Sequence, residues 1–356
     1  MSTLSSHRPS SGRPLALRAD VALILTTLIV AVVGVVIVYS STRSKEILEG
    51  VSSHYFLNRQ AAFVVVGIGV MAGLALLDYH WLEHASAVLY LGIVLALLAM
   101  FSPIGSSAKG ATRWIQIGSV IQIQPSSFAV PVLIVAVATF CARRPEGLGG
   151  RDIAKVLALA AVPILLTAKQ PDLASAIVMC VVLLVMLVVA GIPNRYLVLL
   201  VGGAVLGAVA VVHLGLLKSY QIDRLTSFLH PSKDLQGSNY NPHQSVTAIG
   251  SGGVFGKGLF HGPQTNLSYV PEQQTDFIFS AVGEQLGFVG SASVLVLLGL
   301  VSWRLLRAAQ TSHDVFGRLL AAGAFTFIAF SAFENAGMAM GIMPVAGIPL
   351  PFISYG

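Results

Sequence analysis

The chain has 356 residues, of which 55% are hydrophobic and only 10% are charged, and its mean hydropathy is +0.81. A water-soluble domain carries roughly 25% charged residues, so this composition excludes a soluble globular domain as well as a disordered chain. The two cysteines, Cys141 and Cys180, both lie in apolar runs, which excludes a disulfide scaffold. No basic patch with interleaved aromatic residues is present, so we expect no binding to nucleic acid. The composition predicts an all-α polytopic membrane protein.

Apolar segments follow one another along most of the chain. Residues 1–20 are polar and form the predicted N-terminal tail, and residues 21–356 form a single predicted transmembrane domain. The first apolar run is too long for a signal peptide, so we interpret it as a retained span. A spanning helix needs about 20 mostly apolar residues. Nine spans are therefore predicted, at 21–39, 61–77, 85–101, 127–141, 156–168, 173–191, 197–217, 277–303 and 319–340.

The distribution of basic residues predicts the orientation of the spans. With the N-terminus in the cytoplasm, 11 of the 21 Lys and Arg residues fall in cytoplasmic segments. Four of the other ten lie in the long polar segment 218–275, and long loops cross a membrane with little regard to charge. The bias therefore favours a cytoplasmic N-terminus, and it makes 218–275 an extracytoplasmic loop.

A glycine-rich stretch at 250–258, Gly-Ser-Gly-Gly-Val-Phe-Gly-Lys-Gly, resembles a phosphate-binding loop only at first sight. A Walker motif needs Gly five residues before its Gly-Lys pair, where Ser251 stands, and Ser or Thr after the Lys, where Gly258 stands. Because glycine tolerates positive φ angles, the stretch instead favours a series of tight turns that is re-entrant or hugs the surface.

Four acidic residues lie in or beside the predicted spans, where carboxylates are costly and often functional. Asp276 stands at the predicted start of the eighth span, as a general base or as a simple helix-start acid. Glu284 follows two turns later on the same predicted face, as a second acid or as a hydrogen-bond anchor between helices. Asp172 is a helix N-terminal acid or a cavity residue. Glu334, beside Asn335, either pairs with a buried cation or is protonated.

Basic residues near the predicted outer face suit a substrate that carries phosphate. The candidates are Arg113, Lys218, Arg224 and Lys257. Trp114, next to Arg113, belongs either to this site or to the belt of aromatic residues at the membrane interface.

Four stretches of the sequence together resemble the shape, elongation, division and sporulation (SEDS) family, which includes RodA, FtsW and SpoVE. The first joins Arg-Trp-Ile at 113–115 to Gln-Pro-Ser at 124–126, and the second is Gln-Pro-Asp-Leu at 170–173. The third runs from 220 to 284 and includes the Tyr-Asn-Pro-His-Gln-Ser and Thr-Asp-Phe-Ile-Phe segments. The fourth is Pro-Val-Ala-Gly-Ile-Pro-Leu-Pro-Phe-Ile-Ser-Tyr-Gly at 344–356. The short tail and the loop sequence are most similar to the RodA branch.

This resemblance implies a peptidoglycan glycosyltransferase of the bacterial cytoplasmic membrane that polymerises lipid II at the outer face during cell elongation. It implies a class B penicillin-binding protein as partner, and a divalent cation, Mg²⁺ or Mn²⁺, as a possible cofactor. It also implies ten spans, of which the sequence supplies nine and ends where the tenth would begin. Asp276 matches the acid of the family and is the predicted catalytic residue. The predicted substrate-binding residues are Arg113, Trp114, Lys218, Arg224, Gln244, Ser245, Lys257 and Glu272, and the predicted structural or cavity residues are Asp172, Glu284, Glu334 and Asn335.

The sequence also departs from the family pattern. The usual Gln-Pro-Ser-Glu and the Lys three residues after it are replaced at Ser127 and Val130, so a charged pair of the membrane cavity is missing. The usual Glu-Glu pair ends in Gln285, and the His before Thr-Asp is Gln274.

Two other classes of protein remain open at this stage. A transporter that flips a lipid-linked precursor would also contain intramembrane acids such as Glu284 and Glu334 and the proline-interrupted fifth span. Such a protein concentrates its polar groups at the midplane, whereas most of them lie here in or beside the outer loop. A non-catalytic scaffold for a penicillin-binding protein would explain the missing pair at Ser127 and Val130.

Overall fold

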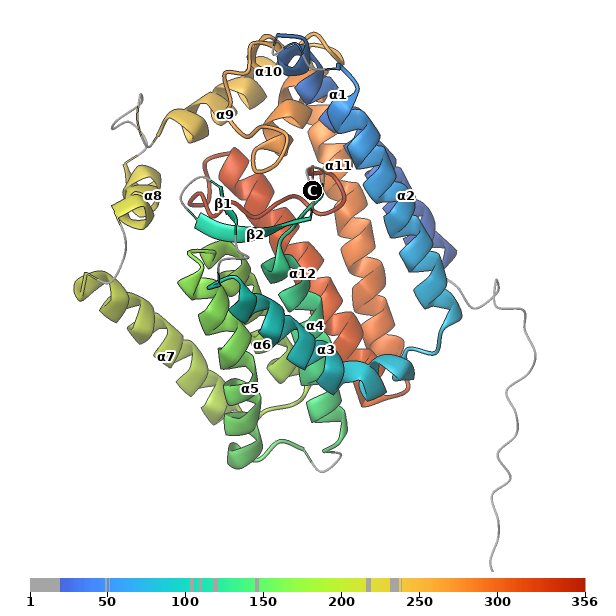
Figure 1. Ribbon diagram of the computed structural model, residues 1–356, viewed down its shortest axis with the longest axis vertical. Coiled ribbons are helices and arrows are strands. Elements are labelled where there is room, and N and C mark those ends of the chain that lie inside the picture. The colour runs from blue at the N-terminus through green and yellow to red at the C-terminus, as the bar shows by residue number, and fades with distance from the viewer. Residues whose placement is uncertain are drawn as a thin grey trace, which may run out of the picture.

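The structure is a computed structural model that describes residues 20–355 except 49, 51, 103–105, 109–110, 118–120, 145–146, 216–218, 231–236 and 238. Its described residues form a bundle of long helices that run roughly along one axis (Figure 1). The helices are α1 (Val21–Leu48), α2 (Tyr55–Leu76), α3 (His80–Ala99), α4 (Pro125–Ala142), α5 (Gly150–Lys169), α6 (Leu173–Val189), α7 (Asn194–His213), α8 (Ser219–Leu229), α9 (Tyr240–Ser251), α10 (Pro263–Asn266), α11 (Ile278–Thr311) and α12 (Val315–Ala339).

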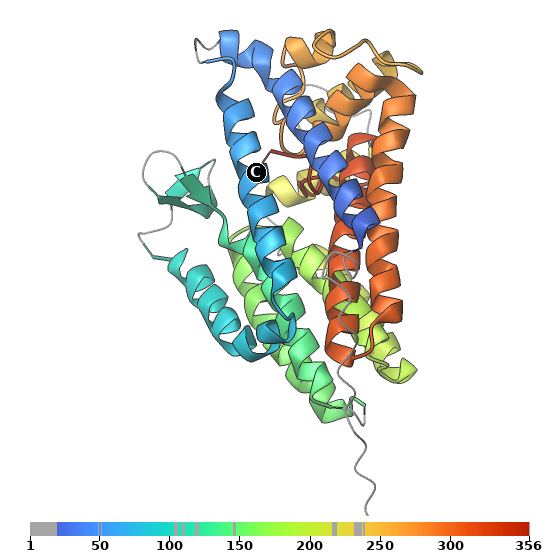
Figure 2. The ribbon, with the colours of Figure 1, turned by 90° about the vertical axis from the view of Figure 1, so that its right-hand side faces the viewer.

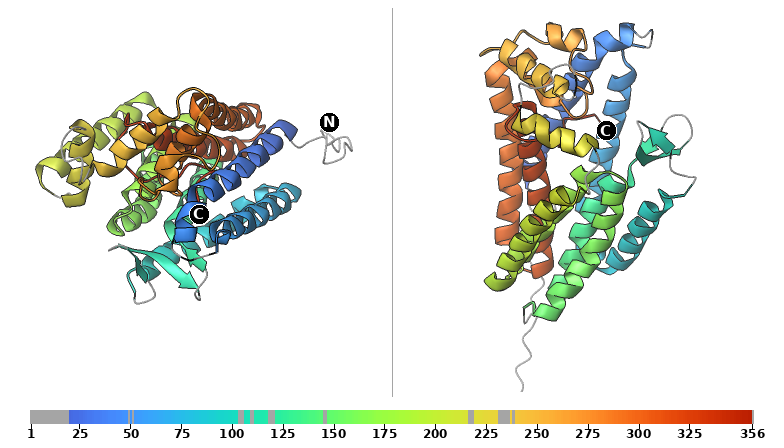
Figure 3. Two further views of the ribbon diagram at one scale, coloured as in Figure 1. Left: turned by 90° about the horizontal axis from the view of Figure 1, so that it is seen from above. Right: turned by 90° about the vertical axis from the view of Figure 1, so that its left-hand side faces the viewer.

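Each of the nine predicted spans corresponds to one helix, α1 to α7, α11 and α12. Seven of these helices in the described part of the chain are long and apolar enough to cross a membrane by length and composition. The other two are α6, which has 17 residues, and α5, which carries Arg151, Asp152, Lys155 and Lys169. Viewed along the bundle, α7 and α8 lie at the edge away from α1 and α2 (Figure 3).

The prediction of a purely helical chain is wrong between α3 and α4. There, β1 (Ser106–Ala108), β2 (Ala111–Ile117) and β3 (Ile121–Ile123) form a small antiparallel sheet in the order β1-β2-β3. The physical signal is present in the sequence, because 111–117 and 121–123 alternate polar and β-branched residues. It is short, however, and it stands between two much longer apolar segments. The fold is thus mostly helical with one small sheet.

The long loop 218–275 contains helices as well as the turns that the glycine-rich stretch 250–258 predicted. The helices are α8, α9 and α10, and α9 and α10 cover one end of the bundle (Figure 2). The stretch between α9 and α10 consists mainly of turns, with positive φ angles at Gly253, Gly256 and Gly258, and the stretch between α10 and α11 consists mainly of turns as well.

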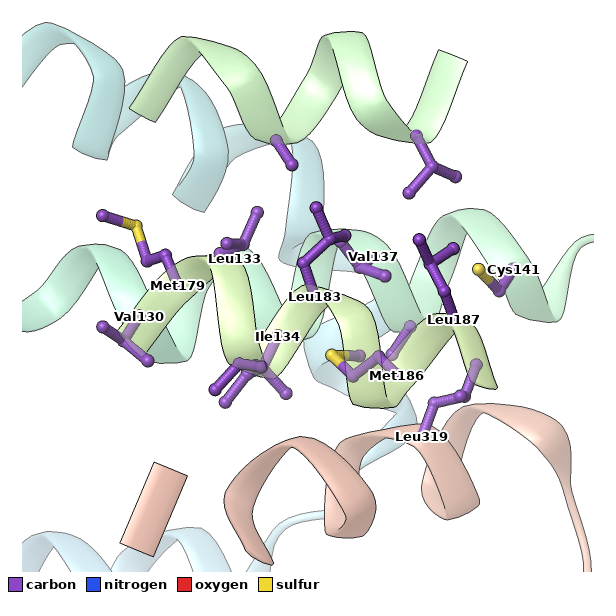
Figure 4. Close-up of a cluster of buried hydrophobic side chains, with 14 of the residues drawn as sticks. Val130, Leu133, Ile134, Val137, Cys141, Met179, Leu183, Met186, Leu187 and Leu319 are labelled. Atoms are coloured by element: carbon purple, nitrogen blue, oxygen red, sulfur yellow. The ribbon is translucent and has the colours of Figure 1, made fainter. Parts of the chain in front are cut away.

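The largest apolar core lies around α4 and α6, which pack against α3, α5 and α12 (Figure 4). Val130, Leu133 and Val137 of α4 are buried, and so are Met179 and Met186 of α6. A second core joins α1, α11 and α12 to the C-terminal segment 350–353. Because lipid tails are as apolar as these side chains, close packing between the helices, rather than transfer out of water, stabilises these cores.

At the end of the bundle opposite α9 and α10, charged and polar side chains join neighbouring segments. Arg304 of α11 binds Asp20 at 2.6 Å and Arg144 binds Asp152 at 2.7 Å. Tyr79 donates its hydroxyl to Asp314 at 2.6 Å, and this hydrogen bond raises the pKa of Tyr79 to about 12. Burial works to raise the pKa of Asp314, but the bonds from Tyr79 and from the Gly317 amide hold it below its usual value.

Helix α11 is broken at Gly287, where φ is +65°. The glycine-rich segment 253–258 forms hydrogen bonds with peptide groups on both sides of the break. The Lys257 and Gly258 amides donate to the carbonyls of residues 284 and 285, at 2.9 and 3.0 Å. In return, the amides of residues 288 and 289 donate to the carbonyls of residues 253 and 254, at 2.9 and 3.0 Å. Two carbonyls before the break and two amides after it are therefore paired. The approach is so close that a β-carbon at Gly252 would overlap the carbonyl oxygen of Gly283.

This contact predicts different outcomes for Gly252, which directly follows α9, and Gly250 within α9. Gly252→Ala places a methyl group against the α11 backbone, so we expect a loss of stability of about 1–3 kcal/mol, as for overpacking. Gly250→Ala meets no atom within 4 Å and is the matched control, with an unchanged or slightly raised melting temperature. Thermal unfolding of the two purified variants in detergent measures the difference. Equal melting temperatures would contradict the proposed close packing.

Candidate functional site

Asp276 lies in a tight turn just before α11, and α11 begins two residues later at Ile278. The carbonyl of Glu272 accepts the amides of Thr275, Asp276 and Phe277 at 3.1–3.3 Å, and Glu272 itself has a φ of +54°. Because Asp276 is not part of the helix, the predicted alignment of Asp276 and Glu284 on one helical face is wrong. The turn leaves the Asp276 side chain partly exposed.

Asn335 of α12 fixes the backbone on which Asp276 stands. Its fully buried side-chain amide donates to the carbonyls of Asp276 and Ile348, both at 2.7 Å. One side chain thus joins the turn before α11 to the C-terminal segment. The hydroxyl of Ser354 repeats this connection, because it donates to the Thr275 carbonyl at 2.6 Å.

The C-terminal segment passes directly beside the Asp276 carboxylate. At Gly347, where φ is +80°, a β-carbon would lie 3.2 Å from Asp276 Oδ2. Arg224 of α8 donates to the carbonyl of the preceding residue, Ala346, at 3.1 Å. The segment therefore brings a carboxylate and a guanidinium to neighbouring peptide groups. The carboxylate is suited to accept a proton, and the guanidinium is suited to bind an anionic group.

Glu334 lies behind this segment as a second acid. Its side chain is 3% exposed, and neither carboxylate oxygen has a hydrogen bond of normal geometry among the described residues. The backbone at Ala346 is beside it, and the charges of Asp276 and Arg224 are close enough to act on it. The predicted cation partner is thus not in contact with it.

Glu284 is an anchor for the extracytoplasmic loop. Its Oε1 accepts the amide of Gln264 at 2.7 Å, and its Oε2 accepts the amide and hydroxyl of Thr265 at 2.8 and 2.5 Å. It is fully buried, and Gly262 leaves the space for its carboxylate. All of these contacts hold α10 against α11, which agrees with the reading of Glu284 as a hydrogen-bond anchor.

Other predicted residues are placed away from Asp276. Ser245 is fully buried and donates its hydroxyl to the Ala339 carbonyl at 2.8 Å, so it packs α9 on α12. Gln244 is partly exposed on the same helix. Lys257 is exposed, and its backbone amide donates to the Glu284 carbonyl. Residue 284 lies about 9 Å of helix rise beyond the start of α11, so Lys257 is distant from Asp276.

Asp172 forms a separate buried cluster at the start of α6. Its carboxylate accepts hydrogen bonds from Gln124 at 2.9 Å, from Ser126 at 2.6 Å and from the Ser175 hydroxyl at 2.9 Å. It also caps α6 through the Ser175 amide. These contacts support its interpretation as a helix N-terminal acid. Lys218 and the side chains of Arg113 and Trp114 lie outside the described residues, although the backbone of 111–117 forms β2.

Of the four residues that depart from the family pattern, three contact other parts of the protein and one is exposed. Val130 is part of the apolar core, and Ser127 is exposed. Gln285 accepts a hydrogen bond from Ser40, which joins α11 to α1. The carbonyl of Gln274 accepts the Tyr355 amide at 2.9 Å.

The residues of the site can also be compared with what a divalent cation needs. Oxygen ligands suit Mg²⁺ and Mn²⁺, and Mg²⁺ is often held by one or two carboxylates together with substrate phosphates. Among the described residues no three His, Cys, Asp or Glu side chains form a metal-binding group. The described residues alone therefore offer no complete protein cage for such an ion.

Comparison with known proteins agrees with this geometry. The family model FTSW_RODA_SPOVE, described as "Cell cycle protein", matches residues 20–356. Stage V sporulation protein E of Bacillus subtilis is 33% identical over 340 residues, which cover 95% of this chain and 92% of that protein. Peptidoglycan glycosyltransferase MrdB of Escherichia coli K12 is 36% identical over 305 residues, which cover 84% of this chain and 80% of that protein.

A solved structure of a peptidoglycan synthase complex, described as coordinating polymerization and crosslinking, contains a chain of the same fold. The TM-score is 0.79 at 28% identity, with 96% of this chain and 93% of that chain covered. The protein is thus a multi-pass helical membrane protein, and it belongs to the FtsW/RodA/SpoVE family.

The structure of the Glu284 contacts generates a prediction. Glu284→Gln replaces one acceptor oxygen with an amide that faces the donors of residues 264 and 265, so we expect a loss of about 1–3 kcal/mol of stability. Thr265→Val removes one hydroxyl, which donates to Glu284 and accepts from Gln273 at 3.1 Å, but it keeps both backbone donors to Glu284 and should lower the melting temperature less. Thermal unfolding in detergent compares both with the wild type, and an unchanged melting temperature in Glu284→Gln would contradict the anchoring role.

Proposed function

We propose that the protein is a peptidoglycan glycosyltransferase that polymerises lipid II into glycan strands at the outer face of the cytoplasmic membrane. Family membership and the name of the MrdB relative support this activity. Within the family we propose a role in cell elongation, like that of the RodA branch, on the sequence of the long loop and of the short N-terminal tail.

The observation that carries the proposal is the position of Asp276. Its carboxylate is partly exposed, its backbone is fixed by Asn335, and Arg224 reaches the adjoining peptide at Ala346. A general base needs a carboxylate that is held in place and accessible to the proton it removes. Asp276 satisfies both conditions at the same end of the bundle as α9 and α10.

In the proposed reaction, the 4-hydroxyl of an acceptor GlcNAc attacks the anomeric carbon of a MurNAc that is held as a polyprenyl diphosphate. The new glycosidic bond forms as the bond to the diphosphate breaks, and Asp276 accepts the hydroxyl proton. The Arg224 guanidinium lies on the Ala346 side of the carboxylate and is suited to offset the charge of the leaving diphosphate. A bound Mg²⁺ or Mn²⁺ would add positive charge at the same diphosphate.

The proposed chemistry requires a particular orientation in the membrane. Asp276, α9 and α10 must lie on the outer side, and the charged pairs at the other end of the bundle on the cytoplasmic side. The excess of basic residues predicted at that end supports this orientation and a cytoplasmic N-terminus.

We also propose a docking surface for the membrane helix of a class B penicillin-binding protein. A groove of about 280 Å³ lies between α11 and α12 and is lined by apolar and small residues, among them Gly299, Ala332, Ala336 and Gly337. Small residues let two helices approach closely within a membrane. The similarity to a chain of a peptidoglycan synthase complex supports a partner of this kind.

Asp276→Asn tests the proposed base. It keeps the size of the side chain but removes its basicity, so we expect polymerisation of lipid II by the complex with a class B penicillin-binding protein to fall by at least roughly 100-fold. The measurement is the amount of glycan strands formed from purified lipid II. Asp78→Asn is the matched control, because Asp78 is 74% exposed at the opposite end of the bundle.

Three other results, from this assay or from a lipid II flipping assay in vesicles, would point elsewhere. If Asp276→Asn polymerises lipid II at the wild-type rate, the proposed role of Asp276 is wrong. If the wild type moves lipid II across vesicle membranes without forming strands, the protein is a flippase. A complex in which only the partner polymerises would indicate a scaffold.

Gly299→Leu tests the docking surface. The larger side chain fills the groove, although a β-carbon at this position meets no atom of the protein itself within 4 Å. We therefore expect normal stability but at least tenfold weaker association with the partner, measured by co-purification and binding in detergent. Gly202→Leu on α7, where a β-carbon also meets nothing within 4 Å, should leave association unchanged. Loss of binding in both variants would contradict a specific site.

A further inference from the structure

A second cavity lies far from Asp276, at the end of the bundle opposite α9 and α10. It has a volume of about 600 Å³, within the range of small-molecule sites (about 300–1,000 Å³), and lies among α3, α4 and α5. Its lining is mixed, with Ala136 and Phe140 of α4 beside Tyr90, Thr139 and Arg143. The proposed reaction at Asp276 uses none of these residues.

One polar atom within this cavity lacks a partner. The side chain of Thr139 is 5% exposed, and its hydroxyl has no hydrogen bond among the described residues. The neighbouring Tyr90 is different, because its hydroxyl donates to the Leu159 carbonyl at 2.7 Å. A buried hydroxyl without a partner is costly and is usually satisfied by a bound molecule or water. The Thr139 hydroxyl is therefore a hydrogen-bonding group inside the cavity that a ligand can use.

The two arginines of the cavity are in different states. Arg144 is fully engaged, since it binds Asp152 at 2.7 Å, donates to the Phe140 carbonyl at 2.8 Å and covers the Phe140 ring at 3.5 Å. This fixes the end of α4 to the start of α5. Arg143 has a side chain that is 63% exposed, and among the described residues it forms one loose pair, with Glu83 at 3.7 Å. A surface pair of this length contributes little, so the Arg143 guanidinium is available to a ligand.

The place of the cavity in the fold limits the kind of ligand. Arg143 directly follows α4, a candidate span, so its guanidinium lies at the edge of the apolar region. The cavity itself extends along the apolar faces of α3 and α4, where Ala87 is exposed. A ligand that fills it needs an anionic group at the membrane edge and an apolar chain below it. Phospholipids with anionic headgroups have both.

We infer that the cavity among α3, α4 and α5 binds an anionic phospholipid, with its phosphate on Arg143 and an acyl chain beside Thr139 and Ala87. Arginine forms charge-assisted hydrogen bonds with phosphate oxygens. The engaged Arg144 holds the rim in place, and a lipid carbonyl or glycerol oxygen satisfies the Thr139 hydroxyl. The ligand stabilises the docking of α3, which otherwise exposes much of its surface.

The test measures the melting temperature of the purified wild-type protein in detergent with four additives. These are phosphatidylglycerol, phosphatidylcholine of the same acyl chains, glycerol 3-phosphate and inorganic phosphate. We expect phosphatidylglycerol to raise the melting temperature in a saturable way and the other three to raise it much less. Phosphatidylcholine carries the same phosphate with its charge balanced by choline, so an equal effect would show that the site does not select an anionic headgroup and would overturn the inference. An equal effect of either soluble phosphate would overturn it in favour of a phosphate site without a lipid.

Three variants test whether phosphatidylglycerol acts at this cavity. Arg143→Gln should weaken binding of phosphatidylglycerol by roughly tenfold or more, through the loss of a charge-assisted hydrogen bond. Ala87→Phe fills the cavity from an exposed position and should remove the response without lowering the melting temperature of the lipid-free protein. Arg151→Gln is the control, because Arg151 is exposed at the same end of the bundle but does not line the cavity. A wild-type response in both Arg143→Gln and Ala87→Phe would contradict the site.

Discussion

The pairing of the glycine-rich segment with the broken helix α11 is the constraint on which the outer half of the molecule depends. Peptide groups within a membrane protein must find partners inside the protein, because lipid supplies none. The break at Gly287 frees carbonyls on one side and amides on the other, and residues 253–258 pair with both. This contact carries α9 and α10 onto the spans, where Glu284 holds α10 with three further hydrogen bonds.

The candidate site is built on this frame from three parts of the chain that are distant in sequence. The turn before α11 supplies Asp276, α8 supplies Arg224, and α12 supplies Asn335 and Glu334. The C-terminal segment at 346–348 passes among them and receives hydrogen bonds from both Arg224 and Asn335. Because most of these contacts are made by backbone carbonyls, the shape of the site depends on the path of the chain more than on the identity of residues 346 and 348.

Much of the fold was predictable from the sequence, since long apolar runs determine where helices form. Each of the nine predicted spans is a helix. A hydrogen-bond anchor was one of the two roles that the sequence left open for Glu284. The small sheet at 106–123 was missed because its alternation is short. The contacts of Asn335 and Ser354 were not predictable, because their partners are backbone carbonyls 13 to 79 residues away. For Ser245, the pattern gave no sign that α9 would turn its hydroxyl towards α12.

The burial of the C-terminal segment has a consequence for how the protein is made. Residues 350 and 353 are enclosed by α1, α11 and α12, and Gly34 of α1 is close to the backbone of residues 352 and 353. A ribosome delivers this segment after every helix described here. The first helix to enter the membrane must therefore wait for one of the last segments before its inner face is covered. The Asp276 turn acquires its hydrogen bonds to Ser354 and Tyr355 at the same late step, so an incompletely synthesised chain is inserted but has no assembled site.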